Sequence, residues 1–106
     1  MSDFLSVHIT ASTRAEAETI ARNLVNEGLS ACVNIVTDMR SIYRWEGKAE
    51  TAHEVLLIAK TTTERFADLE KRVKDLHSHK CPCIVAMPIT AAHQPYLDWL
   101  AAETKS

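Results

Sequence analysis

The chain opens with a two-residue period and then changes to a helical one. In residues 4–10 (FLSVHIT), apolar and polar side chains alternate, which predicts a half-buried strand. Thr13 then precedes a segment whose apolar residues recur every three or four positions, and Glu16 has the spacing of a capping box. Gly28 is suited to the left-handed conformation that ends a helix. The pattern predicts a strand followed by one helix.

A long β-rich segment follows, from residue 29 to residue 47. Its apolar period slips near residues 37–40, which predicts a bulge or bend there. Trp45-Glu46-Gly47-Lys48 has the character of a hairpin tip. The returning segment, residues 53–62, is apolar on both faces around its middle, which is typical of a central strand. A long hairpin is therefore expected.

The rest of the chain predicts a helix, a strand and a short final helix. Thr61 and Glu64 again have capping-box spacing, and a buried stripe runs from Phe66 to Leu76. Residues 84–90 (IVAMPIT) form the fourth predicted strand. Pro95 is placed to start the last helix, with Tyr96, Leu97, Leu100 and Ala101 facing inward.

The element order β-α-β-β-α-β plus a C-terminal helix predicts an α+β, ferredoxin-like split βαβ fold in one domain, residues 1–106. Two helices cover one face of the sheet. The other face has no predicted cover, unless the last helix reaches it. It would carry Val36 and also Ile42, provided that no bulge shifts the register. An uncovered apolar sheet face predicts self-association.

Composition narrows the function classes. The 106 residues carry a formal charge of −2, which argues against a nucleic-acid or anionic-membrane partner. No signal peptide is evident, and the longest wholly apolar run, Val55–Ala59, is too short for a membrane span, so a cytoplasmic location is expected. The odd number of cysteines does not suggest a disulfide framework, and Cys32 has a pattern typical of a core thiol.

The segment His77–Cys83 (HSHKCPC) has the highest density of potential metal ligands in the chain, namely His77, His79, Cys81 and Cys83. In an extended chain these four would form one row. At a rise of ~3.3 Å per residue, however, the ends lie roughly 20 Å apart, so one ion can be shared only by neighbours in the row. Imidazole and thiolate ligands favour copper or zinc over magnesium or calcium. Cys81 and Cys83 with one histidine are the preferred ligand set.

Two other interpretations of this segment remain open. His77 can simply end a helix, where a cation is favourable, with His79 solvated and the cysteines beginning a strand. A dithiol redox switch is the third interpretation, although the chain lacks the CxxC spacing that lowers a thiol pKa. His8 lies on the polar face of the first strand and is interpreted as a surface or interface residue.

A second candidate site is a ligand cleft between subunits. Aromatic pairs on the long strand and on the last helix could line it, although packing between subunits explains them as well. Two charged residues on one side of the returning strand need partners or an exposed pocket. The candidate cleft residues are Glu54, Lys60, Tyr43, Trp45, Tyr96 and Trp99.

Enzyme signatures are missing from the sequence. No glycine-rich phosphate loop occurs, and no Ser-His-Asp or Cys-His arrangement has supporting local sequence. The first loop, TASTRAEA, lacks the glycine-rich loop of acylphosphatases, and the central strands lack the aromatic pair of RNA-recognition modules. The chain is predicted not to be an enzyme.

The strings GLSACVNI, SIYRWEGK, EVLLIAKTT, VAMPI and YLDWL resemble, in order and spacing, the divalent-cation tolerance (CutA) family. The resemblance runs from about Phe4 to Leu100. It implies a ferredoxin-like homotrimer whose long hairpins pair across subunits, with an architecture similar to the PII-like signalling trimers. It also implies a role in tolerance of copper and other divalent ions.

The metal segment departs from the family pattern of His-Pro-Tyr, two residues, then Pro-Glu. His77 and Pro82 match, whereas His79 replaces the tyrosine and Cys83 replaces the glutamate. Two further copper-linked positions of some members fall on Ile9 and Leu76. The resemblance therefore carries over only His77 as a ligand.

The expectation is a cytoplasmic, non-catalytic homotrimer that binds copper or another divalent cation. The alternative is a PII-like trimer that binds a small metabolite or anion between subunits. A scaffold for an unidentified protein partner is a third possibility.

Overall fold

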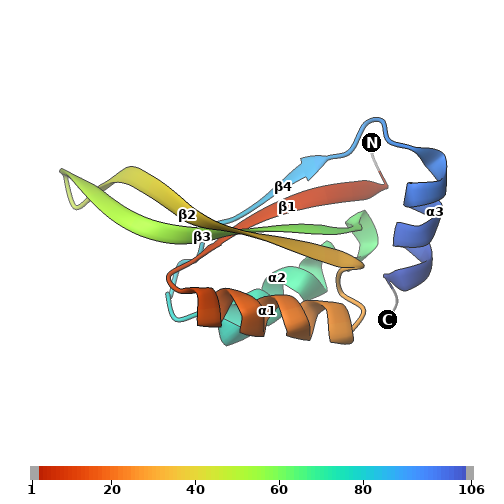
Figure 1. Ribbon diagram of the computed structural model, residues 1–106, viewed down its shortest axis with the longest axis horizontal. Helices are drawn as coiled ribbons and strands as arrows, with labels where there is room; N and C mark the ends of the chain where they lie inside the picture. The colour runs from red at the N-terminus through yellow and green to blue at the C-terminus, as the bar shows by residue number, and fades with distance from the viewer. Residues whose placement is uncertain (1–2, 105–106) are drawn as a thin grey trace.

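The computed structural model describes residues 3–104, which form one antiparallel sheet with helices on one side (Figure 1). The strands lie in the order β2-β3-β1-β4, which is the ferredoxin-like order that the sequence predicts. The elements are β1 (Phe4–Ala11), α1 (Arg14–Asn26), β2 (Cys32–Trp45), β3 (Lys48–Thr62), α2 (Phe66–Leu76), β4 (Ile84–Pro88) and α3 (Gln94–Glu103).

Helix α1 begins and ends as its sequence predicts. The Thr13 side chain accepts a hydrogen bond from Glu16 N at 3.1 Å, which satisfies one free N–H of the first turn. Gly28 has φ +71°, a conformation that favours glycine after a helix. The buried face between them consists of Ala17, Ile20, Ala21 and Leu24.

The start of α2 differs from the prediction. Thr61 does not cap a helix; it remains in β3, opposite Leu5 of β1, and its buried hydroxyl donates to Leu29 O at 2.7 Å. A 3₁₀ turn at Thr63–Arg65 then leads into the helix. Strand pairing outweighs the capping-box spacing here, because β3 is paired with β1 as far as Thr62.

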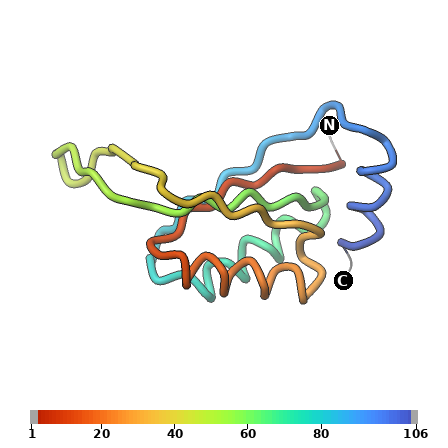
Figure 2. The backbone as a smooth tube through the Cα atoms, in the orientation of Figure 1, coloured from red at the N-terminus to blue at the C-terminus, as the bar shows by residue number. Residues whose placement is uncertain are grey.

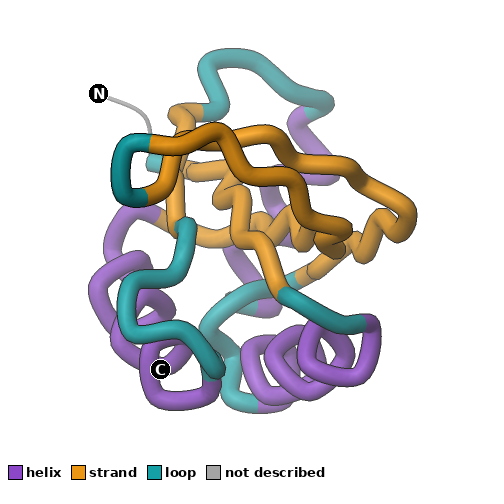
Figure 3. The backbone as a smooth tube through the Cα atoms, turned by 90° about the vertical axis from the view of Figure 1, so that its left-hand side faces the viewer, coloured by secondary structure: helices purple, strands orange, loops and turns teal. Residues whose placement is uncertain are grey.

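The hydrophobic core lies between the sheet and the layer formed by α1 and α2 (Figure 3). Alternate residues of the central strands point into it, such as Val7 and Ile9 of β1 and Leu57 of β3, and all three are fully buried. Leu69 and Val73 of α2 close the core from the other side. No helix in residues 3–104 is long and apolar enough to cross a membrane.

The predicted bulge is present in β2. Val36 pairs with Leu56 and Met39 with Glu54, so two residues of β2 lie opposite one residue of β3, and Asp38 takes φ 63°. Because the extra residue changes the parity, Ile42 lies on the opposite face from Val36. Val36 and Ile42 were expected to share the uncovered face only if β2 had no bulge. The bulge is present, so they do not share it.

The hairpin of β2 and β3 extends well beyond the helical layer (Figure 2). Its tip is a two-residue turn, with Trp45 paired to Lys48 and positive φ at Glu46 and Gly47. Positive φ at both central residues matches the type I′ turns that suit twisted hairpins. The predicted tip is therefore confirmed, and the chain reaches 44 Å in its longest dimension.

The sheet face opposite α1 and α2, called here the outer face, carries apolar side chains. Val36, Val85 and Met87 are exposed by 46%, 51% and 38%. Helix α3 stands at the end of the sheet away from the hairpin tip (Figure 1), where Leu100 is buried. Of the other residues expected to face inward, Leu97 is half-buried, whereas Tyr96 and Ala101 are exposed.

Candidate metal site

The segment His77–Cys83 is a bent connection and not the start of a strand. Helix α2 ends at Leu76, bends occupy residues 78–81, and β4 begins at Ile84. The extended row of four ligands is therefore not formed. The segment divides into a His-Ser-His half and a Cys-Pro-Cys half with different surroundings.

His77 is held inside the protein by both of its ring nitrogens. Its side chain is 0% exposed, and Nε2 lies 2.7 Å from Thr10 O. A carbonyl oxygen only accepts hydrogen bonds, so Nε2 must donate. Nδ1 in turn accepts from the backbone N–H of His79 at 3.0 Å. Both nitrogens of a neutral imidazole are thus used, and a metal ion would have to break one of these bonds.

Glu16 of α1 fixes the same half of the segment. One carboxylate oxygen accepts from Ser12 N at 2.9 Å and the other from Ser78 N at 2.7 Å. His77 Nδ1 lies 4.0 Å from Glu16, but this nitrogen already accepts a hydrogen bond, so the contact is not an ion pair. Burial raises the pKa of Glu16, but the hydrogen bonds from Ser78 and Ser12 outweigh it, so the pKa lies below its ordinary value.

The link between Glu16 and Ser78 was missed in the sequence. The capping-box spacing marked Glu16 as a local residue of the first turn, and the bond from Glu16 N to Thr13 confirms that part. Its carboxylate, however, joins two segments that are 62 residues apart. No local pattern encodes such a contact.

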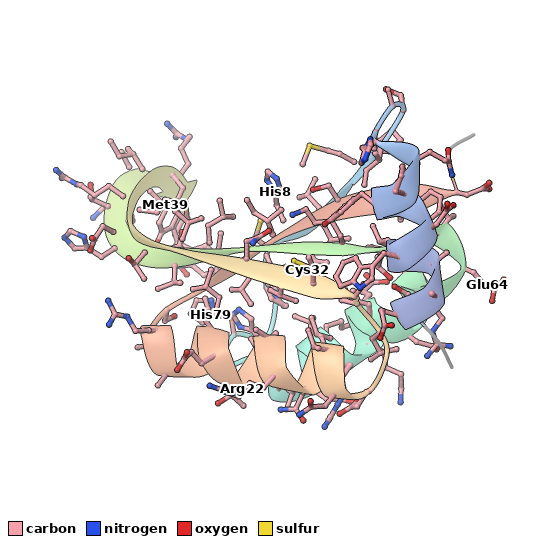
Figure 4. The ribbon with its side chains drawn as sticks, turned by 45° about the vertical axis from the view of Figure 1, so that its right-hand side comes forward. His8, Arg22, Cys32, Met39, Glu64 and His79 are labelled. Atoms are coloured by element: carbon pink, nitrogen blue, oxygen red, sulfur yellow. The ribbon has the colours of Figure 1, made fainter. Side chains whose placement is uncertain are left out.

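His79 lies on the helical side of the sheet, next to α1 (Figure 4). Its Nε2 is 3.0 Å from the Ser12 hydroxyl, and its ring centroid is 5.0 Å from that of His77. The residue itself is exposed. His79 is therefore accessible to an ion only if it gives up its contact with Ser12 or binds through its other nitrogen.

Cys81 and Cys83 are free, exposed thiols on either side of Pro82. Within the described residues 3–104, no three or more His, Cys, Asp or Glu side chains come together as a metal-binding group. One chain thus does not assemble His77, His79, Cys81 and Cys83 around one ion. The assignment of these residues to a metal remains a prediction, and the accessible part of it is the pair of thiols.

The six candidate cleft residues occupy three separate places. Tyr43 and Trp45 lie on the protruding half of the hairpin. Glu54 lines a shallow hollow of about 260 Å³ beside the bulge, together with Asp38 and His53. The other three, Lys60, Tyr96 and Trp99, belong to the end of the sheet near α3.

This third group is connected through Cys32, which Figure 4 places at the α3 end of the sheet. Cys32 pairs with Lys60 across β2 and β3, and Lys60 Nζ donates to Asn34 Oδ1 at 2.5 Å. Burial and the neighbouring Cys32 thiol raise the pKa of Tyr96. The rings of Tyr96 and Trp99 lie 5.6 Å apart. Cys32, expected in the core, is only partly buried.

The chain matches the family model "CutA1 divalent ion tolerance protein" over residues 5–103. The chain belongs to the CutA family. It is 50% identical over 98 residues to the divalent-cation tolerance protein CutA of Thermus thermophilus, covering 92% of this chain and 95% of the relative. The CutA of Archaeoglobus fulgidus is 45% identical over 94 residues, which are 89% of this chain and 91% of the relative.

Solved structures of CutA proteins share the whole architecture. The Thermus thermophilus structure has a TM-score of 0.95 at 48% identity and covers 96% of this chain and 99% of that chain. The CutA1 structure from Oryza sativa also has a TM-score of 0.95, at 36% identity, over 98% and 95% of the two chains. These comparisons confirm the predicted family, fold and long hairpin. CutA proteins are non-catalytic, in agreement with the prediction that this chain is not an enzyme.

Proposed function

We propose that this CutA protein acts in metal-ion tolerance as a homotrimer that binds copper, or a similar soft divalent cation, through Cys81 and Cys83. The observation that supports it is the pair of exposed, free thiols beside Pro82 in a chain of the divalent-ion tolerance family. His79, exposed two residues before Cys81, is the first candidate for an added imidazole ligand. His77 is left out because both its nitrogens are engaged.

The ligand chemistry supports copper or zinc. Thiolate and imidazole are soft or borderline ligands and favour Cu(I), Cu(II) and Zn(II) over magnesium and calcium. Two cysteines at i and i+2 are close enough to share one ion. Because the thiols must lose their protons to bind, affinity should rise with pH.

The trimer is supported by the outer face. Its exposed side chains, such as Val36 and Val85, lie on a sheet surface that α1 and α2 do not cover. Burying them between subunits would stabilise the assembly by about 25 cal/mol per Å² of apolar surface. Sedimentation of the full chain tests this proposal, and a stable monomer at micromolar concentration would contradict it.

A metal titration tests the ligand set. Copper and zinc are added to protein purified without an affinity tag, in competition with a chromophoric chelator. Cys81→Ser/Cys83→Ser should abolish the tight binding, whereas Cys32→Ser, which removes a thiol at the other end of the sheet, should retain it. Equal metal affinity of the double variant and the wild type would contradict the proposal that Cys81 and Cys83 bind the ion.

The alternative proposal is a small anion or metabolite bound between subunits, as in the PII-like trimers. The group formed by Lys60, Cys32 and Tyr96 favours it, because a cation and two donor side chains lie together at the end of the sheet. A metabolite thermal-shift screen distinguishes the two. A shift that Lys60→Met abolishes and chelators do not affect would favour the ligand over the metal.

We also propose a cytoplasmic location for this protein. A protein partner would be identified by pull-down from lysate. Relatives differ in location: the Archaeoglobus fulgidus structure is described as periplasmic, and the Arabidopsis thaliana protein as chloroplastic. Cell fractionation of the source organism would decide the question for this chain.

A further inference from the structure

His8 is a polar residue with apolar neighbours on the outer face. It lies on the opposite side of the sheet from His79 (Figure 4). The strand register places Ile58 of β3 on one side of it and Val85 of β4 on the other. The residue is half-buried, and its side chain has no hydrogen-bond partner among residues 3–104. Unlike the ring of His77, this imidazole is therefore not bonded to any described group of its own chain.

The two neighbouring strands do not supply a counter-charge for this imidazole. On β3, the outer row that contains Ile58 also carries Lys60 and Glu54, because alternate residues of a strand share a face. Lys60, whose Nζ donates to Asn34, is itself a cation, and Glu54 lies roughly 13 Å along the strand from Ile58. The thiol of Cys32 belongs to β2, two strands away. No charge comes from the other paired outer residues of β1 and β4, which are Phe4, Ser6, Thr10, Val85 and Met87.

Burial of the outer face between subunits makes the charge of His8 important for assembly. Moving a neutral imidazole out of water costs far less free energy than moving an imidazolium that has no counter-charge. Histidine side chains ordinarily change charge near pH 6.5, within the physiological range. Each imidazolium that must lose its proton before the subunits assemble weakens the association by up to about tenfold per pH unit below that range.

We propose that His8 makes assembly of the subunits pH-dependent, so that the trimer forms with His8 neutral and weakens on mild acidification. The inference rests on the trimer of the proposed function, whose outer face is buried, and it does not depend on the metal site. Each subunit contributes one His8, so several protons are linked to one assembly step and the pH dependence is steep. The direction follows from the surroundings of the ring, because Lys60 on the same face disfavours a second cation.

The test measures assembly of the full chain by sedimentation between about pH 8 and about pH 5.5, in urea that partly dissociates the wild type. The wild-type association constant should fall at least about tenfold across this range. His8→Gln and His8→Leu, which have no titrating ring, should lose most of this change. His53→Gln and His79→Gln remove exposed histidines and are the matched controls, which should retain it. The comparison isolates His8, because the buried His77 is present in every variant.

The outcomes separate this inference from the proposed function. A wild-type assembly that is equally stable over the whole range, or that strengthens on acidification, would overturn the role of His8 and leave the trimer in place. The same conclusion follows if both His8 variants keep the wild-type pH dependence, because the protons would then bind elsewhere. A chain that is monomeric at every pH in the absence of urea would contradict the proposed trimer and this inference together.

Discussion

The two halves of the segment His77–Cys83 carry the same kind of ligand atoms but lie in opposite environments. His77 and His79 are tied to β1 and to the loop before α1 by hydrogen bonds from or to Thr10, Ser12 and each other. Cys81 and Cys83 are exposed and free. A potential metal ligand is therefore available only where its polar atoms do not already have hydrogen-bond partners in the folded protein.

The largest expected effect comes from removing the buried imidazole. His77→Ala should lower the free energy of unfolding by about 2–4 kcal/mol, because it leaves Thr10 O and His79 N without their partner and opens a cavity. Urea unfolding at fixed protein concentration measures it, since an oligomer's stability depends on concentration. His79→Ala, whose ring is exposed, should cost less than about 1 kcal/mol. Equal losses of unfolding free energy in His77→Ala and His79→Ala would contradict the difference between the buried and the exposed imidazole.

The next effect concerns Glu16, which holds the histidine half from the helix side. Glu16→Gln should cost about 1–3 kcal/mol near neutral pH, because the amide NH₂ faces one of the two N–H donors that the carboxylate accepts. The folded pKa lies below its unfolded value of 4.5, so the ionised group stabilises the folded state above that pH. The contribution is lost as pH falls through the folded pKa.

Unfolding of wild type and Glu16→Gln at several pH values checks the direction of this pH dependence. The difference in free energy should be constant near neutral pH and shrink as the pH falls below 4.5. Glu18→Gln, on the same helix and exposed, is the matched control and should show little difference at any pH. A gap between wild type and Glu16→Gln that widens on acidification would contradict the assigned role.

Local patterns predicted the fold well and the site only in part. Alternation, helical periodicity and the slip near Thr37 gave every strand, the helices and the bulge, because these are set by neighbouring residues. Thr61 stays in β3 because it pairs with Leu5, and the His77 ring is engaged because it bonds Thr10 O. Both partners lie far away along the chain. Ligand types can be read from a sequence, whereas their hydrogen-bond partners require the tertiary structure.

A smaller effect is expected at the contact between the loop before α1 and His79. Ser12→Ala removes the hydroxyl that lies 3.0 Å from His79 Nε2 but keeps the backbone N–H that Glu16 accepts. Since the contact is exposed, the loss should be about 0.5–1 kcal/mol. Urea unfolding measures the stability, and the NMR signals of the His79 ring should shift while those of His77 do not. A coupled change in His77 would show that the two rings do not act separately.

The smallest effect on stability is expected in the cysteine half. Cys81→Ser/Cys83→Ser should change the free energy of unfolding of the metal-free protein by no more than about 0.5 kcal/mol, because neither exposed thiol contributes to the core. The same substitution should remove the stabilisation that added Cu(I) gives, since an ion that binds only the folded state raises its stability in proportion to the logarithm of its affinity. Thermal unfolding with and without Cu(I) measures both quantities in one experiment. A large loss in the metal-free variant would mean that the thiols are structural, and the contrast between the two halves of the segment would disappear.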